Sequence, residues 1–386
     1  MKQDSIPFNK PFIVGKELYY MAEAVLTNRH ISGDGPFSRK CEEFLEHSLK
    51  CRKVLLTHTC TAALEMVALL VDLKPGDEVV MPSFTFVSTA NAFALRGAVP
   101  VFVDVRKDTL NIDERLIPQA ITERTRGIVP VHYAGVPCDM DKIMTIAREH
   151  DLWVAEDAAH AYLSIYREKY LGTIGDFGCL SFHETKNIIS GEGGAILINS
   201  EEFVQKAEII REKGTNRTQF HRGEIDKYSW VDAGSSYLPS DLIAAFLYAQ
   251  LEHAETMINY RCKIISLYNE LLKPLEVSGF IRLPVLENES VGSGHMYYII
   301  TGSMQERSLL IKHLSSKGIG AVFHYVPLHS SLGGIKFGRT SGNMTVTNDI
   351  SDRILRLPLF YQITPEDVET VVKALTEFYA IIDNKG

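Results

Sequence analysis

One lysine stands out in the segment SFHETKNIISGEGG (181–194), because Lys186 lies between two apolar runs that we expect to be buried strands. A lysine is seldom buried without a partner, because a charged amine is costly to remove from water. A desolvated amine loses its proton more readily and can attack a carbonyl to form a Schiff base. The alternatives are a solvated loop lysine, or an ion pair with Glu192 in the glycine-rich turn.

A second polar feature is THTCTAAL (57–64), which follows an apolar run and opens a helical pattern. Thr61 lies near the expected helix N-terminus, where free backbone N–H groups and the helix dipole favour an anion such as phosphate. The competing interpretation is simple capping of the helix by Thr59 or Thr61, since threonine is a favoured N-cap residue. This stretch alone leaves both open.

A third feature is WVAEDAAH (153–160), where Glu156 and Asp157 end an apolar run and His160 follows. A carboxylate at a strand end can hold a cationic ring nitrogen and keep it protonated, because a nearby opposite charge favours the charged form. The alternative is an aspartate that caps the next helix. Taken together, an anion site, a carboxylate for a ring nitrogen and an amine for an aldehyde predict a pocket for pyridoxal 5′-phosphate (PLP).

Short apolar runs alternate with helical patterns from about residue 50, which predicts an α/β fold with a mainly parallel sheet covered on both faces. We expect a large domain over 12–250 and a small α+β domain over 251–386. In the large domain we expect strands at 53–56, 77–82, 99–105, 125–135, 152–157, 178–183 and 194–199, with helices at 61–71, 85–97, 112–122 and 140–150. Around and beyond the domain boundary we expect a long helix at 239–275, strands at 295–302 and 321–329, and helices at 307–318 and 364–382.

The composition excludes several classes of protein. A net charge of −8 gives no reason to expect a nucleic acid or an anionic membrane as partner. The start MKQDSIPFNK has no apolar core typical of a signal peptide, and no apolar run reaches the length of a membrane span. Six scattered cysteines form no CxxC pair, so we expect reduced thiols, no metal site and a cytoplasmic location.

Nearly the whole chain resembles the sugar-nucleotide aminotransferases of the DegT/DnrJ/EryC1/StrS family. The resemblance is carried by THTCTAALEMVALLV, PGDEVVMPSFTFVSTANAFALRGAVPVFVDV, EDAAHA, SFHETKNIISGEGG, SDLIAAFLYAQLE, VFHYVPLH and LRLPLF. It implies the type I fold of PLP-dependent transferases, that of aspartate aminotransferase, and a homodimer with composite active sites.

The resemblance also implies roles for particular residues. Lys186 would attach covalently to the cofactor, and Asp157 would pair with its pyridine nitrogen. The other implied cofactor contacts are Thr61, Ala62 and Ser181 at the phosphate, His160 and Phe86 at the ring, and Ser236 from the other subunit. Many relatives have Asn in a GYN stretch where this chain has Ser236 in GSSY, and serine offers one donor where asparagine offers two.

The segment REKGTNRTQFHRGEIDKYSWVDAGSSYL (211–238) looks most like the subgroup that makes dTDP-4-amino-4,6-dideoxy-D-galactose from dTDP-4-keto-6-deoxy-D-glucose, with L-glutamate as amino donor. That subgroup serves lipopolysaccharide or enterobacterial common antigen biosynthesis. Candidate contacts to the nucleotide sugar are cations of this segment and nearby histidines: Lys213, Arg217, Arg222, Lys227, His183, His295, His324 and His329.

Three alternatives remain at this stage. One is a C3 aminotransferase acting on a dTDP-3-keto-6-deoxyhexose, which no motif above distinguishes on physical grounds. Another is a cofactor-dependent sugar dehydratase, whose relatives replace the lysine with histidine, whereas Lys186 is present here. The last is a non-catalytic regulatory protein of the same fold, which could lose the lysine, the aspartate or Ser181; this chain keeps all three.

Overall fold

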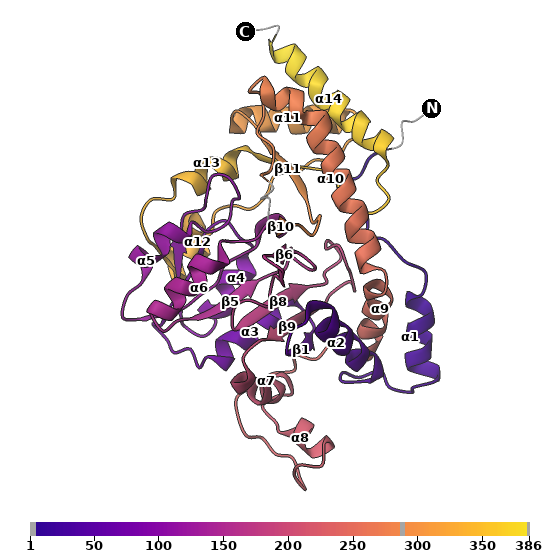
Figure 1. Ribbon diagram of the computed structural model, residues 1–386, viewed down its shortest axis with the longest axis vertical. Helices are drawn as coiled ribbons and strands as arrows, with labels where there is room; N and C mark the ends of the chain where they lie inside the picture. The colour runs from indigo at the N-terminus through magenta and orange to yellow at the C-terminus, as the bar shows by residue number, and fades with distance from the viewer. Residues whose placement is uncertain (1–4, 286–289, 384–386) are drawn as a thin grey trace.

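A mixed sheet forms the centre of the computed structural model, which describes residues 5–285 and 290–383 (Figure 1). Its strands, in spatial order, are β1 (Lys53–Thr57), β9 (Gly194–Ile198), β8 (Phe177–Ser181), β5 (Trp153–Asp157), β4 (Thr125–Ile128), β2 (Glu78–Pro82), β3 (Val99–Val103) and β12 (Arg339–Thr340). Only β9 runs antiparallel to its neighbours β1 and β8; the other neighbouring strands pair in parallel. The mainly parallel sheet is therefore confirmed.

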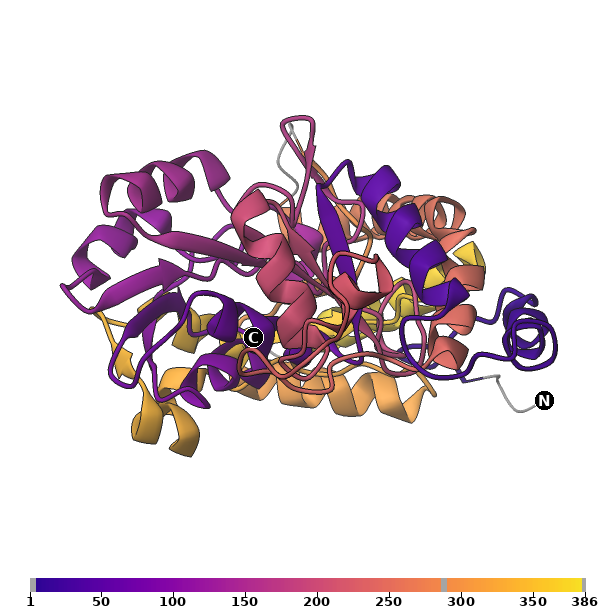
Figure 2. The same ribbon diagram turned by 90° about the horizontal axis from the view of Figure 1, so that it is seen from below.

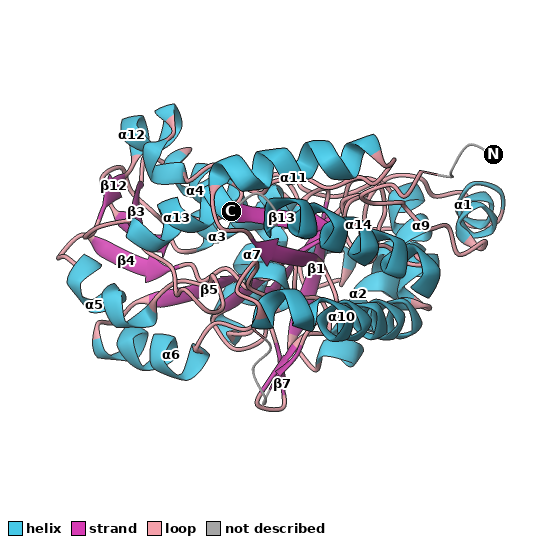
Figure 3. Ribbon diagram, turned by 90° about the horizontal axis from the view of Figure 1, so that it is seen from above, coloured by secondary structure: helices cyan, strands magenta, loops and turns pink. Residues whose placement is uncertain are grey.

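Helices cover both faces of this sheet, as Figure 3 shows from above. Side chains alternate along each strand, so Val54 and Leu56 of β1 join one core and Leu55 joins the other. The first core is completed by α2 (Pro36–Leu49), α6 (Met140–Glu149) and α9 (Asp241–Leu251). The second is completed by α3 (Cys60–Leu70), α4 (Val87–Ala94) and α7 (Val204–Arg211).

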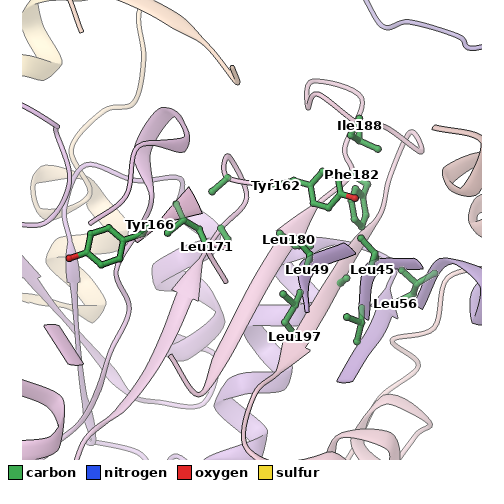
Figure 4. Packing of buried hydrophobic residues seen from close by; sticks show 14 of the residues in the cluster. Leu45, Leu49, Leu56, Tyr162, Tyr166, Leu171, Leu180, Phe182, Ile188 and Leu197 are labelled. Atoms are coloured by element: carbon green, nitrogen blue, oxygen red, sulfur yellow. The ribbon is translucent and has the colours of Figure 1, made fainter. Parts of the chain in front are cut away.

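Figure 4 shows the first core from close by. Leu56, Leu180 and Leu197 come from the adjacent strands β1, β8 and β9, and they face Leu45 and Leu49 of α2. All five are buried, and burying a leucine side chain contributes on the order of 1.5–3 kcal/mol. This packing fixes β8 and β9, and therefore the loop between them that carries Lys186.

A separate core lies in the C-terminal part, formed by a two-stranded sheet and the helices around it. Its elements are α10 (Ala254–Val277), β11 (Tyr297–Ile300), α11 (Met304–Ser316), β13 (Ile354–Leu357) and α14 (Pro365–Asp383). The helix α13 (Thr345–Arg353) joins a smaller cluster through Ile350. Ile6 from the N-terminal segment joins this core, and β12 returns to the edge of the large sheet. The boundary between residues 250 and 251 remains a prediction, and residues 1–4, 286–289 and 384–386 lie outside the described part.

The remaining elements are short or peripheral: α1 (Glu17–Leu26), α5 (Ile117–Ala120), α8 (Arg217–His221), α12 (Leu332–Phe337), and β6 (Ile165–Tyr166) with β7 (Lys169–Tyr170) and β10 (Ser290–Val291). Figures 1 and 2 place α1 at the edge of the molecule, next to α9. In the described residues, no helix combines the length and apolarity needed to cross a bilayer.

Four expected elements differ from the structure. The strand predicted at 125–135 ends at Ile128 as β4, and the 3₁₀ turn η2 (Tyr133–Gly135) follows. The helix predicted at 239–275 is interrupted between α9 and α10, at Glu252 and His253. The helix predicted at 112–122 is a 3₁₀ turn, η1 (Glu114–Leu116), followed by one turn of α5. The strand predicted at 321–329 is wrong: only Val322 forms a bridge, and the 3₁₀ turn η4 (Leu328–Ser330) follows. The backbone of Tyr325 has φ +22°, a value that regular strands do not adopt.

Candidate active site

A cavity of about 690 Å³ is lined by residues from the sheet end and from the C-terminal part. Thr61 of α3, Asp157 of β5 and Lys186 of the turn after β8 line it from the side of the large sheet. Tyr325 and Arg356 line it from the C-terminal part. The structure thus brings together most of the sequence-predicted site residues: Thr61, Phe86, Asp157, His160, Ser181, Lys186, His183, His295 and His324 all line this cavity. Ligands of open α/β sheets bind at this end, beyond the carboxyl ends of the parallel strands.

Lys186 lies in the turn that connects β8 to β9, and its backbone N–H donates to the His183 carbonyl at 2.8 Å. No described residue accepts a hydrogen bond from its amine or forms an ion pair with it. Burial lowers the pKa of Lys186 to about 8, although Cys60 and Asp157 act in the opposite direction. Glu192 does not pair with Lys186; its carboxylate lies 3.7 Å from His183 Nε2. Lys186 is therefore a poorly solvated amine facing the cavity.

Asp157 is the last residue of β5, and two groups fix its carboxylate. Its Oδ2 accepts from the Thr89 hydroxyl at 2.7 Å, and its Oδ1 accepts from the Ala159 N–H at 3.2 Å. Thr89 in turn accepts from the Thr85 hydroxyl at 2.8 Å, because its own proton is donated to Asp157. A turn rather than a helix follows β5, so Asp157 caps no helix. Its carboxylate lines the cavity and can hold a protonated ring nitrogen.

The N-terminus of α3 opens onto the same cavity. Thr59 caps this helix, because its hydroxyl oxygen accepts the Ala62 N–H at 3.0 Å. Within the described residues, the N–H groups of Cys60 and Thr61 have no acceptor. The capping and anion interpretations are thus compatible, but the N–H groups available to a phosphate are those of Cys60 and Thr61 rather than that of Ala62.

Two hydroxyl groups complete this end of the cavity. The Ser181 hydroxyl lines it and has no hydrogen-bond partner among the described residues. The Thr61 hydroxyl donates to Ser88 Oγ at 2.8 Å. Ser88, the second residue of α4, and Thr89 beside it are site residues that the sequence did not single out. Their signal was present in FTFVST, where hydroxyl residues gather at a helix start.

Aromatic rings line the same cavity as Lys186 and Asp157. Phe86 stands at the start of α4, is 56% exposed, and its ring lies 6.4 Å from that of Tyr325. His160 stacks on His295 with ring centres 4.2 Å apart. An aromatic ring bound between Phe86 and the histidine pair would therefore have apolar faces on which to lie.

Burial favours the neutral form of three histidines of the cavity, His160, His295 and His324. Burial lowers the pKa of each well below its ordinary value, and Lys186 adds to this effect. The Tyr133 hydroxyl lies 2.7 Å from His324 Nδ1. The Nδ1 atom of His160 is buried and has no hydrogen-bond partner in the part of the chain that the structure describes. An unpartnered buried nitrogen at a cavity wall is a group that a ligand can satisfy.

Other predicted residues lie outside this cavity. Lys213 and Arg217 both contact Glu212, at 3.0 and 3.3 Å, and Arg222 contacts Glu208 at 2.9 Å. Ser236 is exposed on the same segment, which protrudes beyond α7 (Figure 1). His329 contacts the Ser83 hydroxyl at 2.7 Å instead of lining the cavity.

The residues present fit PLP. The α3 N-terminus with Ser181 provides an anion site, Asp157 a carboxylate, Lys186 an unpaired amine and His160 an unsatisfied nitrogen. Bound at such a site, PLP withdraws electrons from the carbon that carries an amino group. Among the described residues, no group of His, Cys, Asp and Glu side chains has the arrangement of a metal site.

The model of the DegT/DnrJ/EryC1/StrS aminotransferase family matches residues 13–376. The chain is 36% identical over 348 residues to the uncharacterized protein MJ1066 of Methanocaldococcus jannaschii, covering 88% of this chain and 89% of that one. It is 31% identical over 380 residues to the spore coat polysaccharide biosynthesis protein SpsC of Bacillus subtilis, covering 96% of each chain.

The structure is also similar to that of Spr1654 from Streptococcus pneumoniae, solved in its PLP form. The TM-score is 0.88 at 26% identity, over 97% of this chain and 98% of that chain. This similarity confirms the predicted fold of type I PLP-dependent transferases. The chain belongs to the DegT/DnrJ/EryC1/StrS aminotransferase family and is a PLP-dependent sugar aminotransferase.

Proposed function

We propose that this enzyme transfers the amino group of L-glutamate to C4 of dTDP-4-keto-6-deoxy-D-glucose, giving dTDP-4-amino-4,6-dideoxy-D-galactose and 2-oxoglutarate. The observation that carries transamination is the cavity in which the unpaired amine of Lys186 shares walls with Asp157 and the α3 N-terminus. The choice of sugar rests on the resemblance of 211–238 to one subgroup of the family.

Each site residue then has a physical task. Asp157 keeps the ring nitrogen protonated, and Thr89 and the Ala159 N–H hold that carboxylate in place. Cys60, Thr61 and Ser181 hold the phosphate. Lys186 would hold the cofactor, and its amine, once free, would carry a proton to and from the α-carbon of the donor. Positioned proton transfer of this kind contributes about 10²–10⁴-fold.

We also propose a homodimer in which the segment 212–236 reaches the cavity of the partner subunit. Its own chain leaves most of this segment in solvent, including Trp230, which is 80% exposed. Lys213, Arg217 and Arg222 would then serve the diphosphate of the nucleotide sugar, and Ser236 the cofactor phosphate. Exposed tryptophan and tyrosine side chains are typical of protein interfaces.

The amino sugar would enter a surface glycan such as lipopolysaccharide or enterobacterial common antigen, and the enzyme would act in the cytoplasm. The support for a glycan pathway is the similarity to SpsC, which is named for spore coat polysaccharide biosynthesis. A C3 aminotransferase is the competing proposal, because the cavity residues act on the cofactor and the donor rather than on one sugar carbon.

The test is incubation of the holoenzyme with L-glutamate and dTDP-4-keto-6-deoxy-D-glucose, followed by NMR of the product. We expect an amine at C4 in the galactose configuration. A parallel incubation with a dTDP-3-keto-6-deoxyhexose should give no amine. Amination only of the 3-keto sugar would replace the C4 proposal with the C3 one, and amination of neither sugar by the cofactor-bound enzyme would mean that it acts on another keto sugar.

A further inference from the structure

One histidine of the cavity wall, His295, has no task in the proposed function so far. It comes from the C-terminal part, is 9% exposed, and its ring stacks on that of His160. Whether a buried imidazole can bind a ligand depends on which of its two nitrogens is engaged and which carries the proton. The contacts around His295 answer both questions.

Arg261 of α10 fixes the backbone at His295. Its Nε donates to the Gly294 carbonyl and its Nη2 to the His295 carbonyl, both at 2.7 Å. Gly294 has φ +65°, and an added Cβ there would lie 2.9 Å from the Cβ of Arg261. The turn that carries the ring of His295 is therefore packed closely against α10 and has little freedom to move.

Asn187, the residue after Lys186, fixes the proton of this ring. Its Nδ2 donates to the Ser293 carbonyl at 2.6 Å, which leaves the oxygen of the same amide for His295. This Oδ1 lies 3.2 Å from His295 Nδ1 and can only accept, so Nδ1 carries a proton. Burial lowers the pKa of His295 well below its ordinary value, and the charges of Lys186 and Arg261 add to this effect. The ring is therefore neutral, with its lone pair on Nε2.

The Nε2 atom of His295 is the nitrogen left for a ligand. It has no hydrogen-bond partner within the part of the chain that the structure describes, and the residue lines the cavity. An unprotonated imidazole nitrogen accepts a hydrogen bond and cannot donate one. A ligand that satisfies Nε2 must therefore bring a donor of its own.

The sugar has such a donor to spare, and the amino donor does not. L-glutamate has two carboxylates, which only accept, and an ammonium group whose nitrogen is the one transferred. The keto sugar has hydroxyl groups at C2 and C3, and the C3 hydroxyl is on the carbon next to the ketone. His295 contacts the residue that follows Lys186, so it lies near the amine that acts at the ketone. The C3 hydroxyl is therefore the donor best placed for Nε2.

We infer that Nε2 of His295 accepts a hydrogen bond from the C3 hydroxyl of the keto sugar and so orients the ketone toward Lys186. Asn187 is then the positioning residue of this histidine. The inference rests on the proposed function. A site built around a substrate hydroxyl rejects an analogue that lacks it, because the buried acceptor is left without a partner.

The test measures binding of unreactive sugar nucleotides to the holoenzyme by calorimetry. The ligands are dTDP-6-deoxy-D-glucose, which has no ketone, its 2-deoxy and 3-deoxy counterparts, and dTDP. We expect wild type to bind the parent compound about 10- to 100-fold more tightly than the 3-deoxy compound. His295→Phe keeps a ring that can stack on His160 but removes the acceptor, so it should bind these two compounds equally. Its affinity for dTDP, and its preference for the parent over the 2-deoxy compound, should match those of wild type.

Asn187→Leu is the second variant, because it lets the proton of His295 move to Nε2. It should reduce the preference for the parent over the 3-deoxy compound and leave the preference over the 2-deoxy compound unchanged, whereas a general loosening of the cavity would reduce both. His313→Phe is the matched control, since this histidine lies 3.1 Å from the Ala374 carbonyl, outside the cavity. It should bind all four ligands as wild type does.

Kinetics provide a further readout. With His295→Phe, kcat/KM for the keto sugar should fall by a factor similar to the lost preference, while the KM for L-glutamate stays constant. A rise in the KM for L-glutamate with an unchanged preference among the sugar nucleotides would assign His295 to the amino donor and overturn the inference.

Equal binding of the parent and the 3-deoxy compound by wild type, or an unchanged preference in a folded His295→Phe holoenzyme, would also overturn it. A loss confined to the 2-deoxy comparison would do the same, because it would assign Nε2 to the C2 hydroxyl. Failure of the proposed function looks different: wild type would then make no C4 amine, whereas the calorimetric comparison requires no turnover.

Discussion

At the scale of single residues, the chemistry depends on how little water and how few partners Lys186 has. Its amine has no hydrogen-bond acceptor among the described residues, and burial lowers its pKa from 10.5 to about 8. At pH 7.5 roughly a quarter of such amines are neutral, against about one in a thousand for an ordinary lysine. A neutral amine can attack an aldehyde, so the cavity prepares the residue before the cofactor arrives.

We therefore predict that the apoprotein captures PLP with a rate that rises with pH and has its midpoint near 8. Between pH 8 and 10.5, Lys186 is protonated more often in the unfolded chain than in the folded one. The free energy of unfolding of the apoprotein therefore also rises with pH in this range. Stopped-flow absorbance would measure the capture. Asp157→Asn should move the midpoint below 8, because this carboxylate raises the pKa of Lys186.

The Lys186→Ala variant is the control for that titration. It should form no covalent adduct and should lose at least about 10²–10⁴-fold in turnover. A midpoint near 10.5 in wild type, or the same covalent capture by the alanine variant, would show that another amine reacts.

At the scale of elements, the site depends on how closely β9 approaches the start of α3. Gly194, the first residue of β9, packs its backbone against Thr59 and Cys60; an added Cβ would lie 2.4 Å from the Cys60 nitrogen. This contact explains the last glycine of the GEGG turn, since any side chain would displace the helix end that presents its N–H groups. The helix N-terminus and the strand end are thus positioned by one another.

Gly194→Ala should therefore lower the affinity for PLP and destabilise the fold by about 1–3 kcal/mol, as overpacking in a well-packed core does. Fluorescence titration of the apoprotein and chemical denaturation would measure the two effects. Gly333→Ala is the matched control, because a Cβ there meets nothing within 4 Å. Equal behaviour of the two variants would contradict the proposed role of this contact.

At the scale of the whole molecule, the segment 212–236 is the part whose position one chain does not explain. It projects from the body beyond α7 and includes α8 (Figure 1). Its side chains Tyr228, Trp230 and Val231 are at least half exposed. Large apolar side chains on such a projection suggest an interface. The cations Lys213, Arg217 and Arg222 of the segment do not line the cavity of their own chain. A second copy of the chain would cover these side chains.

We predict that two inactive variants complement each other when refolded or co-expressed together. One carries Lys186→Ala; the other carries Lys213→Ala, Arg217→Ala and Arg222→Ala. If the segment serves the partner's cavity, a mixed dimer has one intact site, and random mixing restores about a quarter of wild-type activity. If the segment serves its own cavity, mixing restores nothing, and analytical ultracentrifugation would confirm that dimers had formed.

The sequence by itself determined the features whose signals are local. Strand–helix alternation predicted the parallel sheet, because each amphipathic period is set by the residues of one segment. Lys186, Asp157 and Thr61 were singled out because each follows an apolar strand, and the parallel strands β1, β5 and β8 bring their carboxyl ends to one edge. Family motifs in the same segments then gave the cofactor and the reaction class.

Only the tertiary structure decided which groups are already engaged and which remain free. Thr59 takes the Ala62 N–H, Thr89 holds Asp157, and Glu192 leaves Lys186 unpaired. The strand expected at 321–329 is lost because Tyr325 turns into the cavity wall. In the sequence Arg356 is only part of the motif LRLPLF, whereas the structure places it in the wall of the cavity that Lys186 also lines. These outcomes depend on contacts between segments that are distant in the sequence. The hydrophobic periodicity or composition of a single segment cannot predict such contacts.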